Sequence, residues 1–581
     1  MIARVLPDVP ALSSKTFDYL VPERLRDQVR VGTMVRVELH GRRIGGWVVD
    51  VVDEPATAHT LKAIAKVTGW GPSADVIDLA RWAAWRWAGR VTAFVGTASP
   101  DRAVPSLPRL GDWPASARPI TQSLAGVGAD LADEAWAKAP AVVRWPPGVD
   151  LFPLVLGACR LGPALVLSPS IDTATHLGLR LRRAGVPVAI MPRDWAGAAA
   201  GGCTVVGARA AAWAPVPDVA AVVVLDEHDE SYAEERAPTW NSRDVAVERA
   251  ARAGVPFVLA SPAPSLEALT LDHVAPLVVP TRRAERDGWP LVDVVDRRRD
   301  DPSTGLYSRR LVDLLRSGRR VVCVLNRKGR ARLLACHACG ELARCETCGA
   351  AVEQRDDALM CRACGMTRPV VCIACGSTRM RTLRPGVSKI QEELEALAGV
   401  PVAEVTGDGR DGLGDERVIV GTEAVLHRVD RADAVAFLDF DQELLAPRYR
   451  AAEQAMALLV RAARVTGPRT AGGRVVVQTR LPKHEVVEAA LHADPSRVSA
   501  AEADRRRALG YPPFAAMAVL SGEAAPAFVA ELGRPPGVAV LGPTDGRWLL
   551  RAPDHETLCD ALAAAPRPPG RLRVEVDPLR L

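Results

Sequence analysis

The stretch VVVLDEHDESY, residues 222–232, decides the fold class of the segment around it. A continuous apolar run such as VVVL is typical of a strand that is covered on both faces within a parallel sheet. The run ends in two carboxylates, Asp226 and Glu227. Carboxylates at this position can hold the magnesium ion of a nucleotide-driven motor. A motor that contains such a strand also needs a phosphate-binding loop elsewhere in the chain.

Similar apolar runs recur in two series, separated by helix-like stretches. The first series is ALVLS (164–168), VPVAIM (186–191), CTVVG (203–207), AVVVLD (221–226) and PFVLAS (256–261). The second series is RVVCVLN (320–326), VPVAEV (400–405), RVIVG (417–421), AVAFLDFD (434–441) and RVVVQT (474–479). This spacing indicates parallel strands with helices on both faces of the sheet. We therefore expect two α/β lobes in tandem, at residues 140–290 and 291–480.

The segments that flank the lobes have other patterns. Residues 1–96 begin with the strand-like runs TMVRVEL (33–39) and RIGGWVVDV (43–51), and a helix is expected from Ser73 to Gly89. Residues 97–139 are rich in Pro and small residues, which predicts a linker. Residues 481–581 mix helix-like and strand-like pieces and predict a small α+β domain.

The overall composition is that of a globular protein. The 581 residues are 48% apolar and 25% charged, and the formal net charge of +5 is weak evidence for nucleic-acid binding. No stretch of about 18 uncharged apolar residues occurs, so no membrane span is expected. The opening MIARVLPDVPAL lacks the apolar core of a secretory signal. We expect a cytoplasmic protein, whose twelve cysteines favour metal binding over disulfides.

Eight of the cysteines form a cluster inside the second lobe. They are arranged as four CxxC pairs: Cys336/Cys339, Cys345/Cys348, Cys361/Cys364 and Cys372/Cys375. Eight thiolates fill two tetrahedral sites, and zinc is favoured over an iron–sulfur cluster. A Gly follows each pair, as the tight turn of a metal-binding knuckle requires. Sequential and nested pairings are both allowed, and the module is either a structural clamp or a surface for DNA or a partner.

Further motifs occur in a fixed order around these lobes. They are KTFDYLVP (15–22), RKGR (327–330), RPGVSKIQEEL (384–394), LDFDQELLAPRYRAAEQ (438–454), VVVQT (475–479) and RRALGYPPF (506–514). Together with the cysteine insertion, they make the chain resemble the PriA family of primosomal replication-restart proteins. The resemblance covers nearly the whole chain. It implies two tandem RecA-like helicase lobes with a two-zinc insertion at 336–375, a small β-rich N-terminal DNA-binding domain at 1–96 and a small α+β C-terminal domain.

The resemblance also implies roles for particular residues. The two zinc sites are expected to be nested, with one ion on the outer pairs, Cys336, Cys339, Cys372 and Cys375, and the other on the inner pairs, Cys345, Cys348, Cys361 and Cys364. The TFDY segment is expected to hold the 3' end of a DNA strand. Phe17 or Tyr19 would stack on the terminal base and Asp18 would accept a hydrogen bond from the terminal hydroxyl. The alternative is that the two aromatic rings pack the small barrel.

The phosphate-binding loop is missing from the place where the family has it. That segment reads VVRWPPGVDLFPLVLGACRLGPA (142–164), and the chain contains no Gly-Lys-Ser/Thr sequence. Pro146 and Pro147 remove two N–H donors that the loop would need. Asp226 and Glu227 are then relics of an acidic motif, or at most contribute to a weak magnesium site, and no catalytic or cofactor-binding residue is assigned.

The arginines of the motor are also displaced. An ungapped count from VVVQT puts Val465 and Pro468 where the family has arginines for the γ-phosphate, although Arg461, Arg464 and Arg469 lie nearby. Several altered motifs together predict negligible ATP hydrolysis. Two zinc ions per chain are expected, and ATP is disfavoured as a cofactor.

The expected function is a restart factor that recognises abandoned or stalled forks and helps to assemble the primosome without helicase activity of its own. The implied partners are forked and single-stranded DNA, the proteins that load the replicative helicase, and the single-strand DNA-binding protein. One alternative is an active 3'-to-5' helicase with a divergent nucleotide site. Another is an interaction protein that has lost its DNA affinity. The winged-helix domain of the family has no obvious counterpart, because residues 97–140 are short and rich in Pro.

Overall fold

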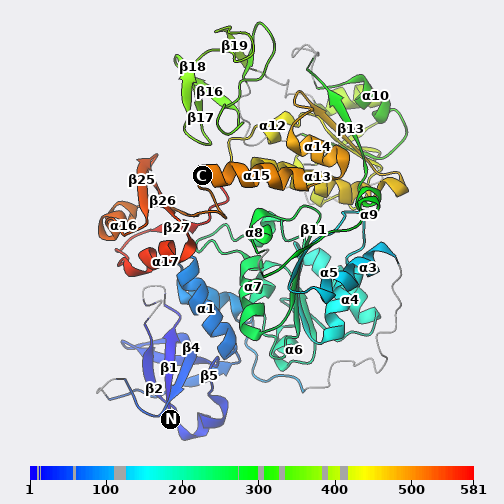
Figure 1. Ribbon diagram of the computed structural model, residues 1–581. Coiled ribbons are helices and arrows are strands. Elements are labelled where there is room, and N and C mark those ends of the chain that lie inside the picture. Colours follow the sequence, from blue (N-terminus) through cyan, green and yellow to red (C-terminus); the bar gives the residue numbers. More distant parts are fainter. Residues whose placement is uncertain are drawn as a thin grey trace.

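The computed structural model describes most of the chain. It covers residues 1–580 except 10–11, 13–14, 57–59, 110–125, 272–273, 299–305, 326–333, 383–389 and 406–415. The motif RKGR (327–330) and the first part of RPGVSKIQEEL (384–394) therefore lie outside the described residues. Two α/β lobes are stacked on each other, with the N-terminal domain beside the first lobe and the cysteine-rich insertion at the outer side of the second (Figure 1).

The N-terminal domain is an antiparallel sheet with two helices. Its strand order is β2-β1-β4-β3-β5. The strands are β1 (Ile2–Pro7), β2 (Phe17–Leu20), β3 (Met34–Leu39), β4 (Arg42–Val52) and β5 (Lys66–Gly69), and the helices are α1 (Ala74–Arg86) and α2 (Val91–Ala98). Val35 and Val37 are buried while Arg36 and Glu38 are exposed, which is the alternation of a half-buried strand. Most of the predicted helix from Ser73 to Gly89 is α1, which ends at Arg86.

Lobe 1 is a seven-stranded parallel sheet covered by helices. Its strand order is β12-β6-β11-β10-β7-β9-β8. The strands are β6 (Ala141–Arg144), β7 (Ala164–Leu167), β8 (Val188–Ile190), β9 (Thr204–Gly207), β10 (Ala221–Leu225), β11 (Phe257–Ser261) and β12 (Leu277–Val278). The helices are α3 (Val127–Ala137), α4 (Phe152–Leu161), α5 (Ile171–Arg183), α6 (Trp195–Ala200), α7 (Ser242–Ala253), α8 (Leu266–Leu269) and α9 (Arg282–Gly288). Every residue of β10 is buried, as the run VVVL predicts.

Lobe 2 repeats this architecture with a six-stranded parallel sheet. Its strand order is β13-β23-β22-β14-β21-β20. The strands are β13 (Leu291–Asp296), β14 (Val321–Val324), β20 (Val402–Val405), β21 (Val418–Gly421), β22 (Ala434–Phe437) and β23 (Arg474–Thr479). The helices are α10 (Arg309–Leu315), α11 (Ile390–Ala398), α12 (Asp441–Leu444) and α13 (Ala451–Thr466). The prediction of two tandem α/β lobes, each built on a parallel sheet, is confirmed.

The insertion and the C-terminal domain are smaller units. The insertion has β15 (Leu334–Cys336) paired with β19 (Met380–Thr382), and a sheet of β16 (Val352–Arg355), β17 (Ala358–Cys361) and β18 (Thr367–Pro369). The C-terminal sheet has the order β25-β26-β24-β27 and is antiparallel. Its elements are β24 (Ala516–Ser521), α16 (Ala525–Leu532), β25 (Ala539–Thr544), β26 (Arg547–Ala552), α17 (His555–Ala564) and β27 (Arg573–Val576).

Two segments lie elsewhere than the predicted boundaries place them. Helix α3 falls within the expected linker 97–139, yet its Leu131 and Ala135 are buried in the core of lobe 1. Helices α14 (Glu485–His492) and α15 (Ser496–Leu509) follow residue 480, but Val486 and Val498 are buried in the core of lobe 2. Both segments carry an apolar stripe that only the neighbouring lobe can cover, and a boundary drawn from composition does not register that stripe.

The C-terminal domain connects the N-terminal helix α1 to lobe 1. Arg86 of α1 forms an ion pair with Asp577 at 2.7 Å, and Trp85 Nε1 donates to Asp560 at 2.8 Å. α1 and α17 lie side by side (Figure 1). Along the described part of the chain, no helix is both long and apolar enough to traverse a bilayer.

Candidate functional site

The carboxyl ends of β6, β10 and β11 meet at one edge of the lobe 1 sheet. Strand β11 lies between the other two, with Ser261 paired to Arg144 and Ala260 paired to Leu225. Because parallel strands end at the same edge, the loop after β6 and the acidic motif after β10 lie on either side of Ser261. This is where a nucleotide-driven motor would bind the phosphates and the magnesium ion.

The loop after β6 bonds to its surroundings rather than forming an open cradle of N–H groups. Trp145 N donates to Ser261 O at 2.8 Å, and Val149 N donates to Pro146 O at 3.0 Å. Gly148 N donates to Gly288 O at 2.9 Å. Two further positions are prolines without an N–H. The backbone donors that a phosphate would require are thus absent or engaged at these positions.

Lobe 2 covers this loop at Gly148. A Cβ atom at Gly148 would lie 2.8 Å from Gly288 O and 2.8 Å from the Cβ of Pro468. Pro468 follows α13 of lobe 2, so the loop and the second lobe are packed against each other. At Gly148, the loop is therefore packed closely against lobe 2 and has no room for another group.

A carboxylate occupies the start of the helix that follows the loop. Asp150 accepts a hydrogen bond from Phe152 N at 3.1 Å and pairs with Arg180 at 2.6 Å. Burial alone would raise the pKa of Asp150, but Arg180 and the Phe152 N–H hold that pKa below its usual value. The helix N-terminus, which attracts phosphates in nucleotide-binding proteins, here attracts a side chain of the same chain.

The acidic motif is bound to arginines from lobe 2. Asp226, whose backbone is left-handed with a φ of 51°, pairs with Arg464. Asp229 pairs with Arg461 at 2.5 Å. Burial would raise the pKa of Asp229, but Arg461 and other bonds hold it below its usual value. Arg464 also donates to Pro147 O at 3.4 Å, so one side chain bridges the acidic motif and the loop.

The ungapped count puts Val465 and Pro468 at the arginine positions of the family, and which arginines would serve a nucleotide stays a prediction. Arg461 and Arg464 are the residues that reach lobe 1, because one face of α13 presents them to the acidic motif. Arg469 instead donates to the carbonyl of Pro290 at 3.3 Å. Residues three positions apart lie on one face of a helix, so Arg461 and Arg464 point to the same side of α13.

Glu227 is held by the segment ASPAPS (260–265). It accepts hydrogen bonds from the N–H and the hydroxyl of Ser265, both at 2.7 Å, and lies 3.4 Å from Arg243. Its side chain is fully buried. A carboxylate with these three partners is fixed in place and has no exposed oxygen with which to orient a water molecule.

A cleft of about 1030 Å³ lies between the lobes next to the acidic motif. It is lined by α5, α13 and the last residues of the C-terminal domain, among others. The cleft is large enough for a small molecule, but its lining includes arginines and carboxylates that are already paired, such as Arg464 and Asp226.

The four CxxC pairs adopt one repeated backbone geometry. In each pair the Gly after the second Cys has a φ between 74° and 76° and donates its N–H to the carbonyl of the first Cys at 2.8–3.0 Å. These glycines are Gly340, Gly349, Gly365 and Gly376. Only Gly adopts this left-handed conformation without strain, which explains its place after every pair.

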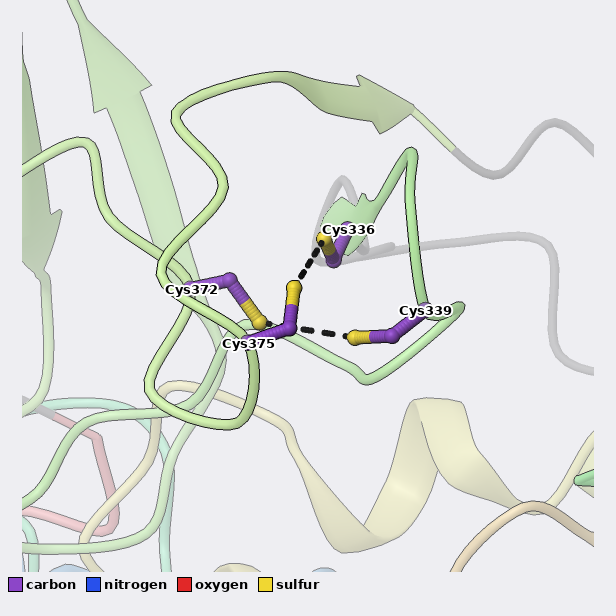
Figure 2. A group of neighbouring side chains, drawn as sticks. All are labelled: Cys336, Cys339, Cys372 and Cys375. Atoms are coloured by element: carbon purple, nitrogen blue, oxygen red, sulfur yellow. Dashed lines mark hydrogen bonds between the residues drawn. The ribbon is translucent and has the colours of Figure 1, made fainter.

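The cysteines converge as two groups of four in nested order. One group is Cys336, Cys339, Cys372 and Cys375, and the other is Cys345, Cys348, Cys361 and Cys364. Within each group the sulfur atoms lie within 4.8 Å of one another. Figure 2 shows the outer group, in which Cys336 faces Cys375 at 3.5 Å and Cys339 faces Cys372 at 3.6 Å.

The spacing of the sulfur atoms fits one metal ion per group. Four thiolates at about 2.3 Å from a tetrahedral ion lie about 3.8 Å apart, close to the separations in the structure. The ligands of an iron–sulfur cluster surround several iron atoms and stand farther apart. Burial would raise the pKa of Cys336, but N–H groups of Cys339 and Ala338 and nearby thiols lower it to about 6. Each group can therefore hold a single ion.

The insertion is attached to the rest of the protein at its inner group. Ala351 N donates to Leu445 O at 2.9 Å, and Tyr511 OH donates to Ala363 O at 3.2 Å. In the outer group, Cys339 and Cys375 are exposed. Cys203, Cys323 and Cys559 lie outside the groups and are buried, and Cys159 is partly buried.

The three residues of the DNA-end prediction lie on β2, at the edge of the N-terminal sheet. Tyr19 is 4% exposed, and its hydroxyl donates to Glu38 O at 3.1 Å. Phe17 is partly buried against the same core. Asp18 pairs with Arg4 at 3.1 Å and accepts from Ala56 N at 2.7 Å. The structure thus brings these side chains to one edge, with Phe17 the more accessible ring. Their contacts with DNA stay a prediction.

Sequence reasoning did not identify the partners of these residues. Arg4 and Arg180 come from distant parts of the chain and lack a motif of their own. The heptad-like spacing of Arg450, Gln454, Arg461 and Arg464 was the available signal for a charged face on α13.

The chain is similar to known replication restart proteins. The family profile described as 3'DNA-binding domain (3'BD) matches residues 4–100. The "Replication restart protein PriA" of Treponema pallidum is 32% identical over 336 residues, which cover 54% of this chain and 51% of that protein. The protein of the same name from Bacillus subtilis is 28% identical and is covered over 43% of its length. The chain thus spans about half the length of these two relatives.

Another relative aligns over most of its length. The "Probable replication restart protein PriA" of Mycobacterium tuberculosis (strain H37Rv) is 29% identical over 583 residues, which cover 89% of this chain and 86% of that protein. Among solved structures, Saccharomyces cerevisiae Dbp5 bound to RNA and ADP BeF3 matches with a TM-score of 0.36 and 10% identity, covering 66% of this chain and 93% of the other.

Proposed function

The chain belongs to the PriA family of replication restart proteins, and we propose on this premise that it recognises abandoned replication forks and helps to assemble the primosome without a motor of its own. The N-terminal domain would hold the 3' end of the arrested strand, and the two lobes would carry the DNA beyond it. The acidic residues Asp226 and Glu227 would serve the fold rather than catalysis.

The missing or already paired phosphate-binding groups at the nucleotide site carry this proposal. Phosphoryl transfer needs a protein that positions the phosphates and neutralises their charge. Here Pro468 packs against Gly148, Asp150 occupies the helix start and Arg464 is bound to Asp226. Each electrostatic contact to a transition state is worth roughly 3–4 kcal/mol, so the loss of several leaves negligible hydrolysis.

Two zinc ions per chain would stabilise the insertion, one on each group of four cysteines. Zinc would supply a structural crosslink, because the four thiolates of each group would leave no coordination position for a reactant. The insertion has few apolar residues of its own, so its folding would depend on the metal. Its outer group, with Cys339 and Cys375 exposed, would face partners.

The proposed partners are forked and single-stranded DNA, the proteins that load the replicative helicase, and the single-strand DNA-binding protein. The proposed location is the cytoplasm, where replication takes place in bacteria such as those that hold the relatives.

An active 3'-to-5' helicase is the second candidate function. It is favoured by one observation, the presence of Arg461 and Arg464 beside the acidic residues Asp226 and Asp229. In a motor, arginines of the second lobe approach the γ-phosphate from this side. The same arginines would then have to exchange their carboxylate partners for a nucleotide.

Steady-state ATP hydrolysis with and without forked DNA distinguishes the two functions. We expect no DNA-stimulated turnover from the wild type, and no difference from an Asp226→Ala, Glu227→Ala variant. Turnover that disappears in this variant would establish the helicase instead. In parallel, binding to forks with a 3' end at the branch should weaken steeply as salt rises, because phosphate contacts release counterions. Weak binding that does not respond to salt would indicate an interaction protein without DNA affinity.

A further inference from the structure

One face of helix α13 forms a ladder of polar contacts to lobe 1. Arg450, Gln454, Arg461 and Arg464 are spaced by four, seven and three residues, which places them on one side of a helix. Their partners are Glu267, Glu230, Asp229 and Asp226 in the same order. The contacts run along the helix from just before its first residue to near its last.

We infer that this ladder is a clasp that holds the two lobes in a fixed closed arrangement without nucleotide. The inference deepens the proposed function, on which it rests for its biological meaning, because it explains how a protein without a motor keeps one DNA-binding shape. In a motor, a bound nucleotide bridges the lobes and its hydrolysis releases them. In this chain, side chains of lobe 2 make the bridging contacts themselves.

The clasp is shielded from solvent at both ends. Arg450 and Glu267 are 13% and 16% exposed, and Arg464 and Asp226 are 29% and 16% exposed. Ion pairs at this depth are screened less by salt than surface pairs. Burial would raise the pKa of Glu267, but Arg450 and nearby arginines lower it to about 2, so the carboxylate is charged at neutral pH.

Helix α15 adds a further contact to the clasp. Glu453 of α13 accepts from Leu266 N of lobe 1 at 3.2 Å, and the buried Arg506 of α15 binds the same carboxylate. Arg506 is also 3.8 Å from Glu267. The guanidinium of Arg506 thus contacts Glu453 of lobe 2 and Glu267 of lobe 1, and so helps to hold the two lobes together.

The test compares a clasp variant with a matched control, both without DNA and without nucleotide. The clasp variant is Arg461→Ala, Arg464→Ala. The control is Arg310→Ala, which removes an arginine paired with Asp293 inside lobe 2. Small-angle X-ray scattering should show a larger radius of gyration for the clasp variant alone. Amide hydrogen exchange of residues 226–232 should accelerate by about tenfold or more, as the loss of ~1.4 kcal/mol of closing free energy implies.

A charge-conserving variant guards against misfolding. Arg461→Lys, Arg464→Lys keeps both charges and should retain the compact form, whereas an unfolded lobe would not be rescued by lysine. Unchanged scattering and exchange in the alanine variant would overturn the clasp. A smaller radius of gyration of the wild type in the presence of magnesium and ATP would also overturn it, because lobes that are already closed cannot close further. Failure of the proposed function would be separate, because it would appear as DNA-stimulated ATP hydrolysis while the clasp variant still opens.

Discussion

The replacement Gly148→Ala tests whether the nucleotide site is filled. The new Cβ would lie 2.8 Å from both Gly288 O and the Cβ of Pro468, and 3.0 Å from the Cδ of Pro468. Carbon atoms at rest are separated by about 3.5–4.0 Å, so the flanking segments must move by roughly 1 Å. The hydrogen bond from Gly148 N to Gly288 O opposes that movement at 2.9 Å.

The expected cost is that of overpacking, about 1–3 kcal/mol. For a lobe of this size, 1 kcal/mol corresponds to ~2–4 °C in the melting temperature. Thermal unfolding followed by circular dichroism should therefore show a lower first transition. The matched control is Gly96→Ala, since a Cβ there would meet no atom within 4 Å. Gly96 lies in α2, so its replacement should be neutral or stabilising by roughly 0.5–1 kcal/mol.

The opposite outcome has a clear meaning. If Gly148→Ala melts at the temperature of the wild type, as the control should, then the space beside the loop is open. A phosphate could then approach the loop backbone, and the argument against a nucleotide site would lose its main support. Gly288→Ala is a second test of the same packing, because its Cβ would lie 2.4 Å from the Cβ of Pro146.

Three further predictions follow from the metal sites, the DNA-end residues and the C-terminal contact. Elemental analysis should find close to two zinc ions per chain, and Cys361→Ser should loosen the insertion without unfolding the lobes; one zinc or any stoichiometric iron would contradict this. Phe17→Ala with Asp18→Ala should weaken binding to forks with a 3' end at the branch more than binding to duplex, and an equal loss would indicate a disturbed barrel instead. Burial alone would raise the pKa of Asp577, but Arg86 and His555 hold it well below its usual value, so its charge stabilises the fold above about pH 4 and this stability is lost as the pH falls further. Asp577→Asn should therefore lower the melting temperature at pH 7, with a difference that shrinks only below about pH 4; a difference that is constant with pH would rule out the charge as the cause.

The strands of both lobes were predictable because their runs are buried on both faces. A strand such as β10 is apolar throughout, and its length and spacing suffice to identify a parallel sheet. The CxxC pairs were predictable for a different reason, since each is a local motif whose Gly is required by its own turn. β13, with the sequence LVDVVD, was missed, because its two Asp residues interrupt the apolar pattern.

The closure of the nucleotide site was only half predictable. The sequence shows that the segment 142–164 lacks Lys and contains two adjacent prolines, Pro146 and Pro147. The packing of Pro468 on Gly148, however, joins residues about 320 positions apart in the chain. The same holds for Arg464 and Asp226, whose pairing depends on how the lobes stack. The roles of Asp150 and Arg180 also depend on the fold, since neither residue belongs to a motif.

The entry and exit strands of the cysteine insertion lie side by side. Leu334 is paired with Thr382 and Cys336 with Met380, so the two ends of the insertion lie next to each other. A segment whose two ends meet can be removed or exchanged as a cassette, because closing the remaining gap costs little chain entropy. The lobe could thus have acquired the insertion in one genetic event without rearranging its sheet. A chimera that exchanges residues 334–382 between relatives should fold if the receiving surface keeps the contacts at Leu445 and Tyr511.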